Sequence, residues 1–157
     1  MTLTTNRYIM PHSFCRIWIH SIWSTKDHHP FISTAIENQL FDIIRQEFLK
    51  IGCPVRIVNG MPDHVHCLFL LNPQKSIAEV IKQIKGSSSH IINQQDLITE
   101  KFAWQVGYGA FSVSESVLPK AYTYIKNQKQ HHQKKSFQEE SDQFIKMYGL
   151  GKDKNSD

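Results

Sequence analysis

Apolar residues recur every three or four positions in four stretches of the chain, a spacing that predicts four amphipathic helices. Three of these stretches begin with Ser or Thr followed three residues later by Glu, the pattern of a capping box. The three pairs are Thr34 with Glu37, Ser76 with Glu79, and Ser136 with Glu139. Together with the Gly and Pro residues that end helices, these pairs place the helices at residues 34–51, 76–91, 116–132 and 136–149.

Between the helices lie segments rich in β-branched and aromatic residues, which predict strands over residues 13–23, 54–61, 64–71 and 102–113. Gly107 and Gly109 are positions where the last strand could bend or bulge. Pro62 and Asp63 form a turn between the second and third strands, so these two strands should pair as a hairpin. The order β-α-β-β-α-β, followed by two more helices, predicts an α+β fold. We expect a ferredoxin-like or RRM-like antiparallel sheet with helices on one face, plus two C-terminal helices.

The length of 157 residues indicates one domain, placed at residues 13–150, with flexible termini at 1–12 and 151–157. No apolar run reaches the roughly 20 residues that span a bilayer, and the first residues lack the apolar stretch of a signal peptide. A cytoplasmic protein is therefore expected. Cys15 and Cys67 lie in apolar runs and are expected to be small core residues.

The net charge is +4, and the sequence "KAYTYIKNQKQHHQKK" at residues 120–135 contains five lysines and no acidic residue. Such a run is most often the solvated face of a helix. It is also typical of a surface that neutralises nucleic-acid phosphates. Here the run includes Tyr and Gln at helical spacing, which favours the second interpretation.

His64 and His66 open the apolar run "HVHCLFLL". Side chains alternate along a strand, so both imidazoles point to one face, about 7 Å apart along the backbone. They are either half-exposed polar residues bonded to water or neighbours, or two ligands of one metal ion. Two histidines alone leave a metal site incomplete, so a further ligand must come from elsewhere in the chain.

The basic helix offers such a ligand. Tyr124 and Gln128 are four residues apart and share a helix face, and an amide oxygen is an acceptable ligand for a hard cation. The phenol of Tyr124 would then lie beside the ion. Tyr122 is a competing tyrosine, about 200° away around the helix. Alternatively, Tyr124 is an aromatic core residue packed beside Ala121 and Ile125.

The segments "PDHVH", "GYGAFSVS" and "YIKNQKQHHQKKSFQEE" together resemble the single-tyrosine HUH transposases of insertion sequences of the 200/605 type. The resemblance covers residues 13–150. The His-x-His pattern alone is a weak motif, but it is specific when Tyr-x-x-x-Gln follows on a basic helix. The resemblance implies a transposase domain that cuts and rejoins single-stranded DNA without a nucleotide cofactor, with its catalytic tyrosine on the first C-terminal helix.

The family's functional residues match positions of this chain. Tyr124 would be the nucleophile, which leaves a covalent 5′-phosphotyrosine and a free 3′-hydroxyl. His64, His66 and Gln128 would hold a divalent cation, Mg²⁺ or Mn²⁺, against the phosphate. The lysines expected to contact DNA phosphates are Lys120, Lys126, Lys129, Lys134 and Lys135.

The resemblance also implies the partners. The substrates would be single strands with hairpins at the ends of the element, in a bacterial or archaeal cell. The family usually forms a homodimer in which the tyrosine helix completes the site of the other subunit, and the spacing here is compatible with cis or trans placement. Trp18, Trp23, Trp104 and Tyr108 could stack on unpaired bases, with at least two of them expected in the core.

Three other functions agree with parts of the pattern. An RRM-like RNA-binding module shares the order of elements, but the strand at 64–71 lacks the K/R-G-F-G-F run of that class. A plain metal-dependent nuclease would use water as its nucleophile and would not need Tyr124. A domesticated relative that processes repeated hairpins of its host would share all of the chemistry.

Overall fold

The computed structural model describes residues 14–131 and 136–147. Within these ranges, four strands form one antiparallel sheet in the order β2-β3-β1-β4, which confirms the expected α+β fold with a ferredoxin-like sheet. Along the chain the elements are β1 (Trp18–Ser24), a short 3₁₀ helix η1 (Lys26–His28), α1 (Glu37–Lys50), β2 (Val55–Met61), β3 (His64–Leu70), α2 (Ile77–Gln94), β4 (Gly109–Val113), α3 (Leu118–Lys126), α4 (Gln128–His131) and α5 (Phe137–Met147).

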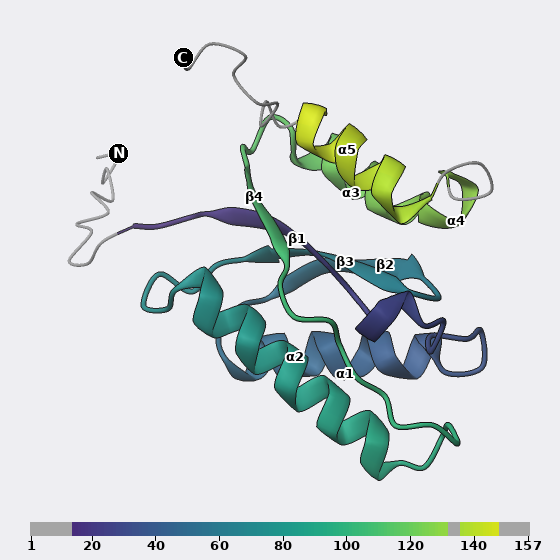
Figure 1. The fold of residues 1–157 in the computed structure, drawn as a ribbon. Helices are drawn as coiled ribbons and strands as arrows, with labels where there is room; N and C mark the ends of the chain where they lie inside the picture. The colour runs from purple at the N-terminus through teal and green to yellow at the C-terminus, as the bar shows by residue number, and fades with distance from the viewer. Residues whose placement is uncertain (1–13, 132–135, 148–157) are drawn as a thin grey trace, which may run out of the picture.

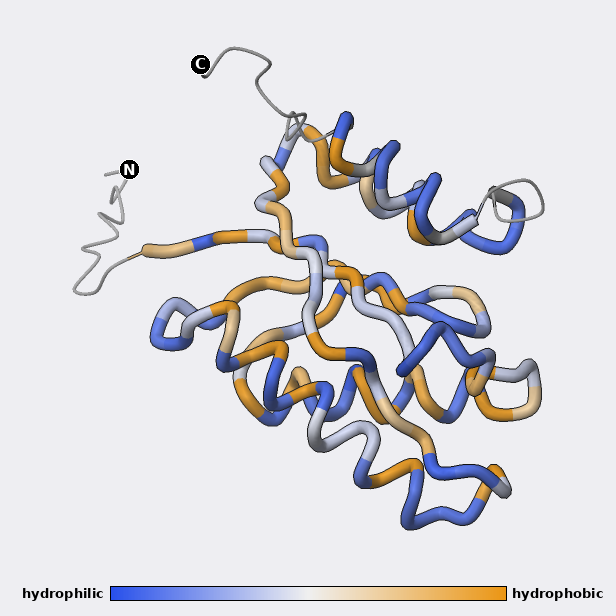
Figure 2. The backbone as a smooth tube through the Cα atoms, in the orientation of Figure 1, coloured by the Kyte–Doolittle hydropathy of each residue, from blue (hydrophilic) through white to orange (hydrophobic). Residues whose placement is uncertain are grey.

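Helices cover both faces of the sheet (Figure 1). The helices α1 and α2 pack on one face, and the main hydrophobic core lies between them and the sheet. Its largest fully buried side chains include Trp23, Phe48, Phe69 and Ile84. Figure 2 shows hydrophobic and hydrophilic segments alternating along both helices, as expected of helices with one buried face.

The opposite face of the sheet lies under α3 and α5 (Figure 1). A smaller apolar cluster joins α3 to this face, and its buried members are Trp18, Leu68, Val113, Leu118, Ala121 and Ile125. Side chains two residues apart on a strand share a face, so the side chain of His66 points to the same side as that of Leu68. The C-terminal helices therefore cover the face that carries the predicted histidine pair.

Two of the three predicted capping boxes are present. In α2, Oγ of Ser76 accepts from the amide of Glu79 at 3.1 Å, and the Glu79 carboxylate accepts from the amide of Ser76 at 3.0 Å. Ser136 and Glu139 make the same reciprocal pair at the start of α5, with distances of 3.3 Å and 3.2 Å. Each box satisfies two backbone donors that have no partner inside the helix.

The capping box predicted at Thr34 was wrong. α1 begins at Glu37, and its N-cap residue, Ile36, makes no side-chain capping bond. Instead, the backbone carbonyl of Ser33 accepts from the amides of Ile36 at 3.1 Å and Glu37 at 3.0 Å. A backbone turn thus satisfies the donors for which the sequence pattern suggested a hydroxyl.

Other elements also differ from their predicted bounds. The first strand was predicted over 13–23, but β1 covers Trp18–Ser24. The last strand was predicted over 102–113, but β4 begins at Gly109 because the chain before it bends, with φ of +96° at Gly107. Trp104 keeps only a single bridge to Thr25 at the end of β1. The helix predicted over 116–132 is interrupted at Asn127, where α3 ends and α4 follows.

The predicted flexible termini at 1–12 and 151–157 lie outside the described residues, as does the helix end predicted at 148–149.

Cys67 is buried, as expected. The expectation for Cys15 was wrong, because it lies before β1 and is exposed. None of the helices within residues 14–131 and 136–147 combines the length and the apolar character that crossing a membrane requires.

Gly60 allows the hairpin of β2 and β3 to close around His64. A Cβ at this position would overlap the carbonyl oxygen of His64 and lie 2.9 Å from Cα of Val65, so a backbone would have to move. We expect Gly60→Ala to lower the free energy of unfolding by about 1–3 kcal/mol, measured by urea denaturation.

Gly86 is the matched control for Gly60→Ala. It lies exposed in α2, and a Cβ there would meet nothing within 4 Å. We expect Gly86→Ala to stabilise the protein by about 0.5–1 kcal/mol, because alanine is the better helix former. Equal effects of the two substitutions would contradict the close approach of β2 to β3 at Gly60.

Candidate active site

Two histidines of β3 meet a glutamate of α5 beneath the C-terminal helices. His64 and His66 are fully buried and lie two residues apart on the same face of the strand, as predicted. Nε2 of His64 lies 3.0 Å from Oε2 of Glu140, and Nε2 of His66 lies 3.0 Å from Oε1 of the same carboxylate. One potential ligand atom from each residue lies within 4.8 Å of the others.

The second nitrogen of each imidazole is held by another side chain. Nδ1 of His64 lies 2.7 Å from Oδ1 of Asp63, and Nδ1 of His66 lies 2.9 Å from Nε2 of His20 in β1. Burial and the neighbouring His66 hold the pKa of His20 well below its ordinary value, so His20 is neutral at pH 7. Partners of this kind fix the ring orientation of metal-binding histidines and leave Nε2 for the ion.

Glu140 is the member of the cluster that sequence analysis missed. It lies in the first turn of α5, is 2% exposed, and accepts a hydrogen bond from Oη of Tyr124 at 2.6 Å. Burial by itself would raise the pKa of Glu140, but hydrogen bonds from His64, His66 and Tyr124 lower it, so the carboxylate is ionised at pH 7. Burial likewise works against a charge on His64, but its two carboxylate partners raise its pKa above the ordinary value.

The sequence contains a signal for Glu140 that could have been used. Glu140 follows Phe137 by three residues and precedes Phe144 by four, so it occupies a position in the apolar stripe of its helix. A carboxylate at such a position becomes buried when the helix packs, and a buried charge requires partners. The pair of buried histidines on β3 supplies them.

Tyr124 is the tyrosine that reaches the cluster. Its ring centroid lies 5.9 Å from that of His66 and 6.3 Å from that of His20. The competing residue, Tyr122, lies elsewhere, with the guanidinium of Arg56 in β2 5.7 Å from its ring centroid. The structure therefore brings Tyr124, and not Tyr122, to the histidines within one chain.

Asn59 of β2 fixes the end of α3. It pairs with His66 across the hairpin, and its Nδ2 donates to the carbonyls of the last two residues of α3, at 3.0 Å and 3.2 Å. Carbonyls at a helix end lack intrahelical partners, so these bonds both satisfy the helix and tie it to the sheet. Tyr124 lies within this last turn, which places its phenol over the histidine face.

Gln128 is fully buried at the start of α4. Neither its amide oxygen nor its amide nitrogen has a hydrogen-bond partner among the described residues. Leaving a buried polar group unpaired costs about 1–3 kcal/mol, so an ion or a water molecule is expected beside it. The role of Gln128 as a metal ligand stays a prediction.

The predicted DNA-contacting lysines lie in different surroundings. Lys120 and Lys126 are exposed on α3. Lys129 donates from Nζ to the carboxylate of Glu37 in α1 at 2.6 Å, so part of its charge is already neutralised. Their contacts with DNA stay predictions. The other two predicted lysines, Lys134 and Lys135, lie outside the described residues.

The donor set of His64, His66 and Glu140 fits a divalent cation. In an octahedral site with bonds of about 2.1 Å, neighbouring ligand atoms lie about 3 Å apart, which is the separation of each Nε2 from the carboxylate. A carboxylate suits hard cations such as Mg²⁺, and imidazoles favour Mn²⁺. Asp63 and His20 supply the outer hydrogen-bond partners of such a site.

Comparison with known proteins places the chain in a family. The sequence profile of the family described as IS200-like transposases matches residues 13–128. The chain belongs to this family. The transposase is 31% identical to the ISDra2 transposase TnpA of Deinococcus radiodurans over 114 residues, which cover 69% of this chain and 81% of that protein. The cluster thus lies in a DNA-processing enzyme.

Solved structures agree with the family. A candidate transposase from Deinococcus radiodurans R1 is 27% identical, with a TM-score of 0.61, and the match covers 74% of this transposase and 93% of that chain. A REP-associated tyrosine transposase, solved with a REP hairpin, has a TM-score of 0.57 over 77% of this chain and 72% of its own. At 14% identity, the second likeness shows the shared fold.

Proposed function

We propose that this transposase cuts and rejoins single-stranded DNA through a covalent bond between Tyr124 and a 5′ phosphate. The observation that carries the proposal is the meeting of a phenol with two imidazoles around one carboxylate. Oη of Tyr124 donates to Glu140 at 2.6 Å, and Nε2 of both His64 and His66 lies 3.0 Å from the same group. This arrangement joins a nucleophile to a candidate metal site.

In the proposed reaction, Oη of Tyr124 bonds to the phosphorus of a DNA phosphodiester. The bond from phosphorus to the 3′ oxygen breaks, and that oxygen takes up a proton in place of the one that the phenol loses and leaves as a 3′-hydroxyl. The phosphotyrosine preserves the energy of the phosphodiester, so a 3′-hydroxyl of another strand can displace Tyr124 and reseal the DNA. The hydrogen bond to Glu140 orients the phenol before the attack.

We assign the cation, Mg²⁺ or Mn²⁺, to His64, His66 and Glu140, with the amide oxygen of Gln128 as a further ligand. The buried, unpartnered amide of Gln128 supports this assignment, because an oxygen ligand for a hard cation would then have its partner. When bound, the cation neutralises charge on the phosphate that is attacked. Asp63 and His20 orient the two imidazoles.

The proposed substrates are single strands that carry hairpins. The REP-associated relative was solved with a REP hairpin, and the exposed Lys120 and Lys126 offer positive charge on the tyrosine helix. Because Tyr124 and the histidines meet within one chain, one protomer suffices for the proposed site. A homodimer that exchanges the tyrosine helix would build the same site in trans.

Cleavage of defined oligonucleotides tests the proposal. With Mn²⁺ or Mg²⁺, the purified protein is expected to cut hairpin-forming single strands taken from DNA that flanks its gene, and to leave the matching duplexes intact. Removal of the metal with EDTA should slow cleavage at least about 100-fold, because the cation supplies several kcal/mol. Equal cleavage of duplex DNA, or full activity in EDTA, would contradict the proposal.

A further inference from the structure

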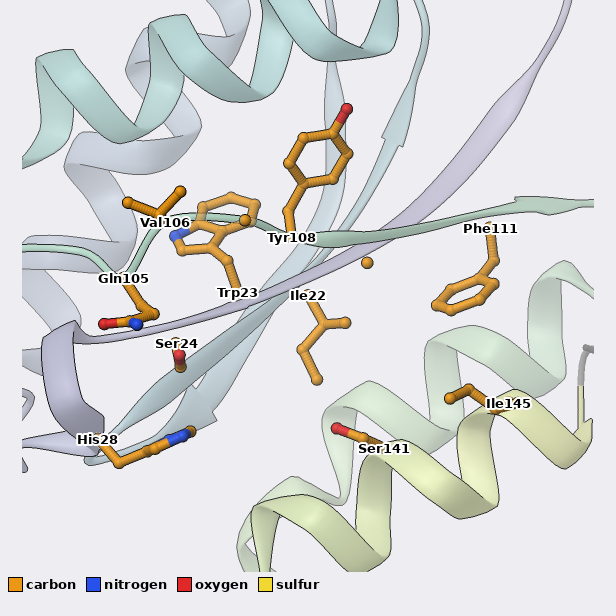
Figure 3. A pocket seen from close by; sticks show the side chains of 12 residues that line it. Ile22, Trp23, Ser24, His28, Gln105, Val106, Tyr108, Phe111, Ser141 and Ile145 are labelled. Carbon is orange, nitrogen blue, oxygen red and sulfur yellow. The ribbon is translucent and has the colours of Figure 1, made fainter.

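A cavity of about 340 Å³ lies between the sheet and α5 (Figure 3). Ile22 of β1 and Phe111 of β4 project into it from the sheet, and Ser141 and Ile145 line it from α5. Its size is at the lower end of the range for small-molecule pockets. The proposed chemistry of Tyr124 makes no use of this space.

The register of the sheet places the cavity next to the proposed metal site. Ile22 pairs directly with His66, and Ser24, also in the cavity wall, pairs with His64. Directly paired residues share a face of the sheet, with Cβ atoms about 4.5–5.5 Å apart. On the side of α5, Ser141 follows Glu140 in the sequence. The cavity therefore begins one side chain away from the cluster.

The wall formed by β4 and the segment before it is held in place. A Cβ on Gly109 would lie 2.9 Å from Cγ2 of Ile22 and 3.2 Å from Cε2 of Phe111, so both side chains would have to shift to admit a larger residue there. Nζ of Lys85 in α2 donates to the carbonyls of Gln105 at 2.6 Å and Gly107 at 2.8 Å. The rim of the cavity is thus fixed to the main body of the protein.

The lining suits a flat heteroaromatic ring. Ile22, Phe111 and Ile145 provide apolar and aromatic surfaces on which a ring can stack, and Figure 3 shows the hydroxyl of Ser141 on the same side as these groups. The amide of Gln105 also lines the cavity, so hydrogen-bonding groups accompany the apolar walls. Tyr108, which is 44% exposed, lies at the same cavity.

We propose that this cavity binds one unpaired nucleobase of the DNA strand, close in sequence to the phosphate that Tyr124 attacks. The inference rests on the proposed function, because it takes single-stranded DNA as the substrate. A base seated between Phe111 and Ile145 positions the backbone next to His66, since the cavity and the cluster share one face of the sheet. The base supplies binding energy and the cluster supplies the chemistry.

Binding of two single strands tests this inference, in EDTA so that no cleavage occurs. One probe is a labelled 12-nucleotide strand that contains all four bases, and the other is an abasic strand of the same length. We expect the wild-type protein to bind the first strand at least about 5-fold tighter by fluorescence anisotropy, as stacking on one base predicts.

Two variants locate that preference. Ile145→Trp, which fills the cavity from α5, and Phe111→Leu, which removes the aromatic wall, are expected to lose most of the preference for bases and to bind the abasic strand as the wild type does. Gln138→Trp places the same indole on an exposed position of α5 outside the cavity and should change neither affinity.

The outcomes separate the inference from the proposed function. If both cavity variants keep the wild-type preference, or if the wild type binds both strands equally, the cavity does not bind a base, while the proposed function stands. If the wild type binds neither strand, both proposals fail. Loss of the preference in Ile145→Trp and Phe111→Leu, but not in Gln138→Trp, supports the inference.

Discussion

Tyr124→Phe is expected to cut single-stranded DNA at least about 10³-fold more slowly than the wild type, because it removes the nucleophile and leaves the rest of the site. The phenylalanine ring keeps its place near His66 and His20, where the ring centroids lie 5.9 Å and 6.3 Å away. Affinity for the uncut strand should stay within about 2-fold, since the hydroxyl faces Glu140 inside the site. Time courses with an end-labelled oligonucleotide in Mn²⁺ measure the rate, and fluorescence anisotropy with the uncut strand in EDTA measures the affinity.

Tyr122→Phe is the control. Tyr122 packs beside Arg56 and not at the histidines, so its hydroxyl should have no part in the reaction, and cleavage should stay at the wild-type rate. If Tyr124→Phe still cuts at a rate near the wild type, water is the nucleophile. The protein would then be a metal-dependent nuclease, and the covalent mechanism would be wrong.

Glu140→Gln is expected to weaken Mn²⁺ binding at least about 10-fold, because it removes the only anionic group of the proposed ligand set and keeps its size. The carboxylate lies 3.0 Å from Nε2 of each histidine, and it is the acidic group that clusters with them among the described His, Cys, Asp and Glu residues. Calorimetric titration of Mn²⁺ into the DNA-free protein measures the affinity without any contribution from catalysis.

Asp142→Asn controls for the loss of one negative charge on the same helix. Asp142 is exposed and bonds only to Gln138 among the described contacts, at 3.1 Å, so Mn²⁺ affinity should not change. Gln128→Ala completes the set. If this variant weakens Mn²⁺ binding and Glu140→Gln does not, the amide is the third ligand and Glu140 only fills the site in the absence of metal.

The sequence predicted the sheet well because its signals are local. Alternation along the strands, the Pro62–Asp63 turn and the helical spacing of apolar residues each depend on neighbouring positions, and the structure confirms the resulting order of strands. Errors arose where tertiary contacts decide. Asn59 of β2 donates hydrogen bonds to the end of α3, and no residue near the break in the predicted helix indicates this contact.

The candidate site was predictable only where its geometry depends on neighbouring residues in the sequence. The common face of His64 and His66 follows from strand geometry alone, and the structure agrees. Glu140 and His20 reach these imidazoles from distant elements, through the packing of α5 on the sheet and the pairing of β1 with β3. Such contacts depend on the complete fold. In the sequence, Glu140 and His20 are marked only as polar residues within an apolar helix stripe and an apolar strand.

Mapping the covalent adduct tests the central claim most directly. The wild-type protein is incubated with Mn²⁺ and a single-stranded hairpin that it cuts, and the digested adduct is sequenced by mass spectrometry. Trypsin releases residues 121–126 as one peptide that contains both Tyr122 and Tyr124, so fragmentation has to distinguish them. We predict a nucleotide phosphate on Tyr124. Cleaved DNA without any protein adduct, or an adduct on Tyr122, would contradict the account.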